Sequence, residues 1–139
     1  MPLVLLDTNP IIRYLTRDNS DQAARARTLF EQAARGEITL YVSESVIVEV
    51  VNVLSSRATY HLPRTEVARH VGNILALKGF QVPGKQTYRR ALDLWVGTPQ
   101  VRDFVDALSV AHAERLKVRE IATFDPDFER FPTINRLQP

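Results

Sequence analysis

The chain alternates between short apolar runs and longer stretches in which apolar positions recur every three or four residues. The short runs predict buried strands, and the longer stretches predict helices. The expected strands cover residues 3–6, 39–42, 79–84 and 120–124. The expected helices cover about residues 9–16, 20–35, 43–56, 87–96 and 103–117, with another beginning after Pro63. Strands separated by helices are typical of an α/β fold with a mostly parallel sheet.

Local signals support several of these boundaries. Asn9 is a good helix N-cap and Pro10 suits the first helical position, so the first helix is expected to start there. Ser20 and Asp21 predict the start of the second helix, and Gly36 predicts its end.

The composition limits the class of protein. A length of 139 residues without a repeat or a linker-like stretch predicts a single domain over residues 1–139. The chain has no Cys, which excludes disulfides, thiolate nucleophiles and Cys-ligated metals. No apolar run approaches the length of about 18 residues that a membrane span needs, and the first run ends at Asp7, too early for a signal peptide. A cytoplasmic protein is therefore expected.

The charge balance says little until the residue types are separated. Lys and Arg number 18 against 16 Asp and Glu, a formal net charge of +2. Of the 18 basic residues, 15 are Arg, which binds phosphate through two parallel hydrogen bonds. The bias is compatible with nucleic-acid binding, and equally with a compositional bias of the source genome.

Two aspartates follow predicted strands directly. Asp7 comes after the first strand and Asp125 after the last. Ligands bind outside the carboxyl ends of strands in open parallel sheets, so these acids are expected to share a crevice. The alternatives are a helix cap at Asp7 and a turn-forming role for Asp125 before Pro126.

Glu49 stands within the run Val46-Ile47-Val48-Glu49-Val50-Val51. A carboxylate surrounded by apolar side chains is costly unless it is paired or bound to a metal, which favours a functional role. In the alternative interpretation, Glu49 belongs to a solvent-facing stripe with Ser45 and Asn52.

Asp103 and Asp106 are three residues apart at the start of a predicted helix and therefore share a face. Their repulsion would be relieved by a divalent cation, although Asp103 could instead cap the helix. Oxygen ligands without Cys or clustered His favour Mg²⁺ or Mn²⁺ over zinc.

With these acids in order on an α/β pattern, the chain resembles the PIN-domain nucleases, and more narrowly the VapC-type ribonuclease toxins of toxin–antitoxin systems. The resemblance covers essentially the whole chain. The matching segments are Leu6-Asp7-Thr8-Asn9 with Arg13-Tyr14-Leu15, Val48-Glu49-Val50, Asp103-Phe104-Val105-Asp106-Ala107-Leu108, and Ala122-Thr123-Phe124-Asp125 with Phe128.

The resemblance implies a single three-layer PIN-like domain and assigns the site. Asp7, Glu49 and Asp106 match the family's invariant acids, and Asp125 matches its more variable fourth. Asp103 matches an extra acid found in many toxin members. These residues would bind Mg²⁺ or Mn²⁺ and catalyse hydrolysis of RNA phosphodiester bonds. The resemblance also implies a homodimer and a cognate antitoxin protein.

Because the site itself is acidic, phosphate contacts are expected from arginines around it, with Arg13 and Arg102 as candidates. Either arginine could equally be an ordinary solvated surface residue.

Other functions fit the sequence less well. A phosphatase of the haloacid dehalogenase type needs a second acid where this chain has Asn9. A phosphoaspartate receiver needs an acidic doublet after its first strand, which is absent. A catalytically silent PIN fold that only binds RNA or protein is the remaining alternative.

Overall fold

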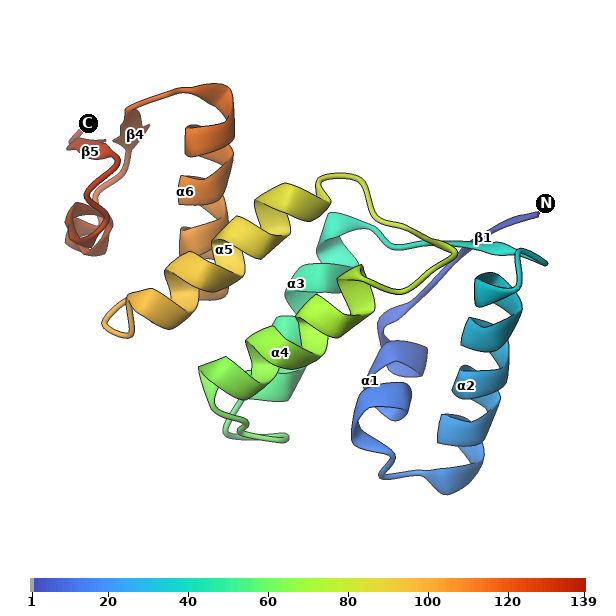
Figure 1. The fold of residues 1–139 in the computed structure, drawn as a ribbon. Helices are drawn as coiled ribbons and strands as arrows, with labels where there is room; N and C mark the ends of the chain where they lie inside the picture. Colours follow the sequence, from blue (N-terminus) through green and yellow to red (C-terminus); the bar gives the residue numbers. More distant parts are fainter. Residues whose placement is uncertain (1) are drawn as a thin grey trace. The chain divides into compact units, whose positions relative to one another are not determined.

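The computed structural model describes residues 2–139 and divides the chain into two compact units, Met1–Pro83 and Gly84–Pro139. Six α-helices alternate with short strands in the described range, which confirms the expected mixed α/β class with parallel strand pairing (Figure 1). None of the helices in this range combines the length and the apolar character needed to cross a bilayer.

The first unit contains a three-stranded parallel sheet in the order β1-β2-β3. Its strands are β1 (Leu3–Leu5), β2 (Thr39–Tyr41) and β3 (Phe80–Gln81). The register pairs Val4 with Leu40, and Leu40 with Phe80. Each parallel pair is joined through helices, as parallel connections require.

Four helices belong to this unit: α1 (Thr8–Thr16), α2 (Ser20–Ala34), α3 (Glu44–Ser55) and α4 (Arg64–Leu75). Helix α1 packs against α2 and α3, and α3 packs against α4. The helices bury one face each, and Phe30 of α2 joins helix to sheet through an edge-on contact with Phe80, with ring centroids 5.0 Å apart.

The second unit consists of α5 (Lys85–Gly97), α6 (Phe104–Leu116), β4 (Glu120–Ala122), the 3₁₀-helix η1 (Pro126–Arg130) and β5 (Asn135–Leu137). Helices α5 and α6 pack together, with Trp95 and Phe104 in edge-on contact at 5.7 Å. Strands β4 and β5 form a parallel pair. Neither η1 nor β5 is predicted by the hydrophobic pattern, because segments this short carry no measurable period.

The predicted start of the first helix is wrong. The helix begins at Thr8, and Asp7 rather than Asn9 occupies the N-cap position. Pro10 is accommodated in the first turn because the amide groups there have no intrahelical acceptor. The second helix is likewise capped one residue early, by Asn19, whose side chain accepts a hydrogen bond from the Gln22 amide at 3.0 Å.

Candidate active site

Asp7 links the end of β1 to the start of α1 in the first unit. Its extended backbone conformation (φ −87°, ψ 173°) is that of an N-cap residue, yet its carboxylate makes no capping hydrogen bond. The residue is exposed. The carboxylate is therefore not used in holding the helix, and it is available for a ligand.

Glu49 lies on α3 and accepts a hydrogen bond from the Thr8 hydroxyl, with 2.9 Å between Thr8 Oγ1 and Glu49 Oε2. Thr8 is buried, with 3% of its surface exposed, so the hydroxyl is firmly placed at the first turn of α1. Because Thr8 follows Asp7 directly, this hydrogen bond brings the Glu49 carboxylate to the same end of α1 as Asp7. The first unit thus gathers two of the predicted site residues.

The expectation that apolar side chains surround Glu49 is wrong. Glu49, Ser45 and Asn52 are all exposed and form the polar stripe of α3. The apolar face is made instead by Ile47, Val50, Val51 and Leu54. Spacings of four and three residues place the polar side chains on one side of the helix, and this periodicity outweighs the local run of valines.

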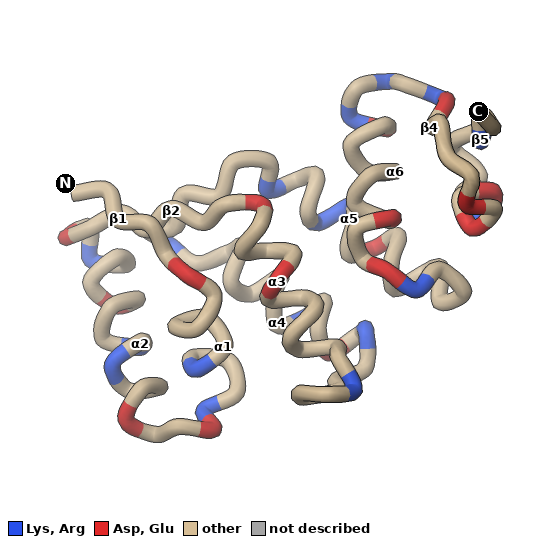
Figure 2. Tube along the Cα trace, turned by 180° about the vertical axis from the view of Figure 1, so that it is seen from behind, with Lys and Arg blue, Asp and Glu red and all other residues tan. Residues whose placement is uncertain are grey.

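Asp103 and Asp106 open α6 in the second unit. Asp103 occupies the N-cap position but makes no side-chain capping hydrogen bond, and Asp106 lies in the first turn. Burial is the largest cause that raises the pKa of the Asp106 carboxyl above its ordinary value. The remaining causes are three neighbouring carboxylates, those of Asp103, Asp125 and Asp127. The second unit therefore concentrates negative charge around Asp106. Acidic positions, drawn red, recur on the α5–α6 pair and in the turn after β4 (Figure 2).

Asp125 has two roles. Its carboxylate accepts a hydrogen bond from the Asp127 amide at 2.9 Å, so it does form the turn that begins η1. Its own amide donates to the Thr123 hydroxyl at 3.0 Å. The same carboxylate adds to the negative field at Asp106, so turn formation and a place beside α6 are compatible.

Asp127 also belongs to this acidic group, and the sequence did not predict it. Its carboxylate contributes to the raised pKa of Asp106, and it also lies 4.0 Å from Nε of Arg130. An aspartate in a turn after a proline is too common to signal a site. The available signal was its spacing of two residues from Asp125.

The acids in each unit are oxygen donors of the kind that Mg²⁺ and Mn²⁺ prefer. Within residues 2–139, no three His, Asp or Glu side chains lie close enough together to form a metal site. Within each unit, the carboxylates match a hard divalent cation in their chemistry.

The two predicted phosphate-binding arginines differ in their surroundings. Arg13 Nη1 lies 2.9 and 3.1 Å from the two carboxylate oxygens of Asp18, and its Nε donates to Gln22 at 2.8 Å. Its guanidinium is therefore held within the first unit. Arg102 is exposed in the segment before α6, and its carbonyl oxygen accepts a hydrogen bond from Trp95 Nε1 at 3.5 Å.

The PIN domain family matches residues 4–134, a range that runs through both units. The chain therefore belongs to the PIN domain family, which confirms the family resemblance seen in its sequence. PIN domains are generally nucleases, a class of hydrolases.

No curated protein matches the chain. Among solved structures, a chain from the crystal structure of VapBC2 from Rickettsia felis bound to a DNA fragment from their promoter is 15% identical to it. The alignment covers 97% of each chain with a TM-score of 0.37. The family assignment rests on the sequence match.

Proposed function

We propose that the protein is a metal-dependent endoribonuclease in which residues 1–139 act as one PIN-like domain. The observation that carries the proposal is the accumulation of four aspartates around the start of α6, in a chain whose family is generally nucleolytic. Like charges near one another are unfavourable for the fold by themselves, and a bound cation would neutralise them.

The proposed ligands of Mg²⁺ or Mn²⁺ are Asp7 and Glu49 from the first unit and Asp106 and Asp125 from the second, with Asp103 as an additional catalytic acid. That the family match spans both units supports assigning these acids to one reaction. When bound, the metal lowers the pKa of a water molecule and stabilises the charge that develops on the phosphate.

The side chains of the chain supply the remaining steps. The Thr8 hydroxyl holds one oxygen of Glu49 and leaves the other oxygen available to a ligand. Asp106 or Asp125 orients the attacking water and takes its proton. The proposed products are a 5′-phosphate and a 3′-hydroxyl.

Cleavage of a labelled RNA with Mg²⁺ or Mn²⁺ tests this proposal. Asp7→Asn should lower the cleavage rate by more than the roughly 10- to 100-fold that loss of an outer-shell partner costs, because a metal ligand itself is lost. The matched control is Asp21→Asn, which removes an exposed aspartate paired with Arg25 on α2. Wild-type cleavage that persists in EDTA, or full activity of Asp7→Asn, would contradict the site.

Calorimetry with Mn²⁺ separates the enzyme from a catalytically silent binding module. A working site should bind Mn²⁺ in a way that depends on both Asp7 and Asp106. Binding that is unaffected by either substitution would favour the silent module.

We further propose that the enzyme is the toxin of a type II toxin–antitoxin pair, acting in the cytoplasm as a homodimer with a cognate antitoxin. The VapC-like order of motifs supports this narrower assignment. Expression should arrest growth, and a co-expressed small protein from the neighbouring gene should relieve the arrest. Continued growth of cells that express an enzyme active on RNA would contradict the toxin assignment and favour a general RNA-processing nuclease.

A further inference from the structure

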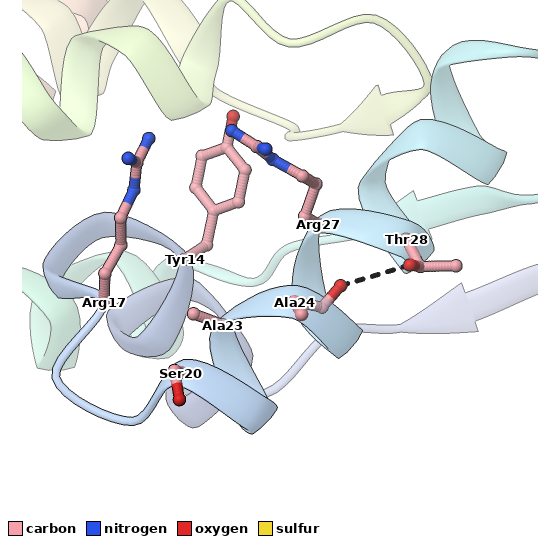
Figure 3. Close-up of a pocket in the computed structure, with 7 residues that line it drawn as sticks. All are labelled: Tyr14, Arg17, Ser20, Ala23, Ala24, Arg27 and Thr28. Carbon is pink, nitrogen blue, oxygen red and sulfur yellow. Dashed lines mark hydrogen bonds between the residues drawn. The ribbon is translucent and has the colours of Figure 1, made fainter.

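A hollow of about 390 Å³ lies between α1 and α2 in the first unit (Figure 3). In this view the side chains of Arg17, Tyr14 and Arg27 extend to the same side of the helix pair. Two alanines form part of the wall and leave room beside the backbone of α2. The complete lining is Tyr14, Arg17, Ser20, Ala23, Ala24, Arg27 and Thr28.

The charge of this hollow is not neutralised. Neither Arg17 nor Arg27 forms an ion pair within residues 2–139, and no acidic side chain is among the lining residues. Two guanidinium groups without carboxylate partners give the hollow a permanent positive charge at any physiological pH.

A second hollow between the same two helices gives an internal comparison. It has a volume of about 430 Å³ and is also lined by two arginines, Arg13 and Arg25. There, however, Arg13 lies 2.9 Å from Asp18 and Arg25 lies 3.7 Å from Asp21. The arginines of this second hollow are thus paired with carboxylates, whereas those of the first hollow are not.

The aromatic residue between the two arginines indicates which anion fits. Tyr14 is half-buried and rests on Phe30, with 4.7 Å between ring centroids, so its position is fixed from behind. A fixed ring flanked by guanidinium groups is typical of surfaces that hold single-stranded nucleic acid, because bases stack on the ring while phosphates bind the arginines. An acidic peptide would use the charges but not the ring.

We propose that Arg17 and Arg27, with Tyr14 between them, bind the backbone of the RNA strand away from the cleavage point. This inference rests on the proposed function. Asp7 and Arg17 mark opposite ends of α1, about 15 Å apart at 1.5 Å per residue. A strand held near Asp7 therefore has to extend by several nucleotides to reach the hollow, which makes it a site for a polynucleotide rather than a lone phosphate.

The test measures binding of a 20-nucleotide, fluorescein-labelled single-stranded RNA of mixed sequence in EDTA, where cleavage is prevented. Fluorescence anisotropy is followed from 50 to 400 mM salt. Each phosphate contact contributes about 0.7 to the steepness of the slope of log K against log salt for a single strand. Losing two contacts in Arg17→Gln/Arg27→Gln should therefore make the slope shallower by roughly 1.4. At 0.1 M salt this corresponds to a loss of affinity of roughly 25-fold.

The matched control is Arg35→Gln/Arg69→Gln, which removes the same net charge from exposed arginines already paired with Glu37 and Glu66. This control should keep the wild-type slope. Thermal melting checks that both double variants are folded, and the single variants Arg17→Gln and Arg27→Gln should each show about half of the effect.

A fluorescent poly-glutamate peptide is titrated in parallel as a second probe. Three outcomes would overturn the inference: no RNA binding by the wild type, equal slopes for the two double variants, or a loss of affinity in Arg17→Gln/Arg27→Gln for the peptide but not for the RNA. The last outcome would assign the hollow to an acidic segment of a protein partner. Binding in EDTA is independent of catalysis, so RNA binding that needs Arg17 and Arg27 without any metal-dependent cleavage would reject the proposed function and retain this site.

Discussion

At the scale of the residue, Thr8 shows how one side chain joins fold and site. It is almost completely buried, yet its hydroxyl is directed at a carboxylate on a neighbouring helix. The hydrogen bond aligns Glu49 beside the end of α1 where Asp7 lies. Thr8 is therefore a positioning residue in the proposed reaction.

Thr8→Val should lose this hydrogen bond at nearly constant volume. We expect a decrease of about 1–2 kcal/mol in the free energy of unfolding, toward the low end for a hydrogen bond to a charged group because Glu49 is exposed to solvent. Cleavage should fall by roughly 10- to 100-fold, as for other groups that orient metal ligands. Thr8→Ser, which keeps the hydroxyl, should restore most of the activity. Equal activity of the Val and Ser variants would exclude a positioning role.

Asp18 is a second residue whose surroundings determine its chemistry. A hydrogen bond from the Tyr60 hydroxyl is the largest cause that lowers the pKa of Asp18, to about 2, with the Thr16 hydroxyl and the Arg13 guanidinium contributing. A carboxyl whose pKa is lower in the folded state stabilises the fold at pH values above its ordinary pKa of 3.8. This stabilisation is lost as the pH falls toward 2.

Asp18→Asn should consequently unfold at lower urea concentration than the wild type at pH 7. The difference should shrink between pH 4 and pH 2, where the wild-type carboxyl becomes protonated. Urea titrations across this range measure it. Asp21→Asn, an exposed aspartate on α2, serves as the control, and a difference that stays constant down to pH 2 would be inconsistent with the lowered pKa.

At the scale of the element, the join between sheet and helix depends on Gly79. Its φ of +86° is in the left-handed region, and a Cβ there would lie 2.1 Å from the carbonyl oxygen of Ala33 on α2. Its own carbonyl accepts a hydrogen bond from the Leu40 amide at 2.9 Å. The glycine therefore allows β3 to pair with β2 while passing close to α2.

Gly79→Ala should destabilise the protein by about 1–3 kcal/mol or more, because backbone atoms cannot give way as a flexible side chain can. Gly72→Ala is the contrasting control. That glycine lies within α4, and a Cβ added to it would meet no atom within 4 Å beyond its chain neighbours and the backbone of its own helix, so alanine should stabilise by about 0.5–1 kcal/mol. Thermal melting of both variants tests the pair, and effects of the same sign would contradict it.

The sequence predicts elements well where a period is sustained and poorly where tertiary pairing decides. All six helices and four of the five strands lie where the hydrophobic pattern indicates them. The predicted burial of the strands is wrong for β1, an edge strand whose residues Leu3–Leu5 are all exposed, and for most of β4. Strand β5 is missed because its three residues form a strand only through pairing with β4. The acids at strand and helix ends could be named from the sequence, but the exposure of Glu49 and the proximity of Asp127 to Asp106 depend on how neighbouring elements pack.

Across the protein as a whole, the uneven distribution of charge opposes the stability of the fold. The net charge of +2 results from 18 basic and 16 acidic residues that are unevenly distributed. Acids accumulate around Asp106, whereas Arg17 and Arg27 are left without carboxylate partners within residues 2–139. A protein arranged in this way should depend on divalent cations for part of its stability.

Asp106→Asn should melt higher than the wild type in EDTA. A carboxyl with a raised folded-state pKa destabilises the fold at neutral pH, and removing one like charge three residues from Asp103 should contribute about 0.2–0.5 kcal/mol. Mn²⁺ at 100 times its Kd should stabilise the wild type by about 2.7 kcal/mol and the variant much less. The order of the two melting temperatures should therefore reverse between EDTA and Mn²⁺, and an unchanged order would argue against a metal at this group.

The crowded carboxylates around Asp106 also have an evolutionary consequence. Most mutations that abolish an enzyme harm its fold as well, so a cell that carries them accumulates misfolded protein. Here, if the proposal holds, neutralising Asp106 should inactivate the enzyme while relieving repulsion in its fold. If the protein arrests growth, survivors of its expression should carry substitutions in this aspartate group more often than core mutations, and their inactive proteins should accumulate in soluble form.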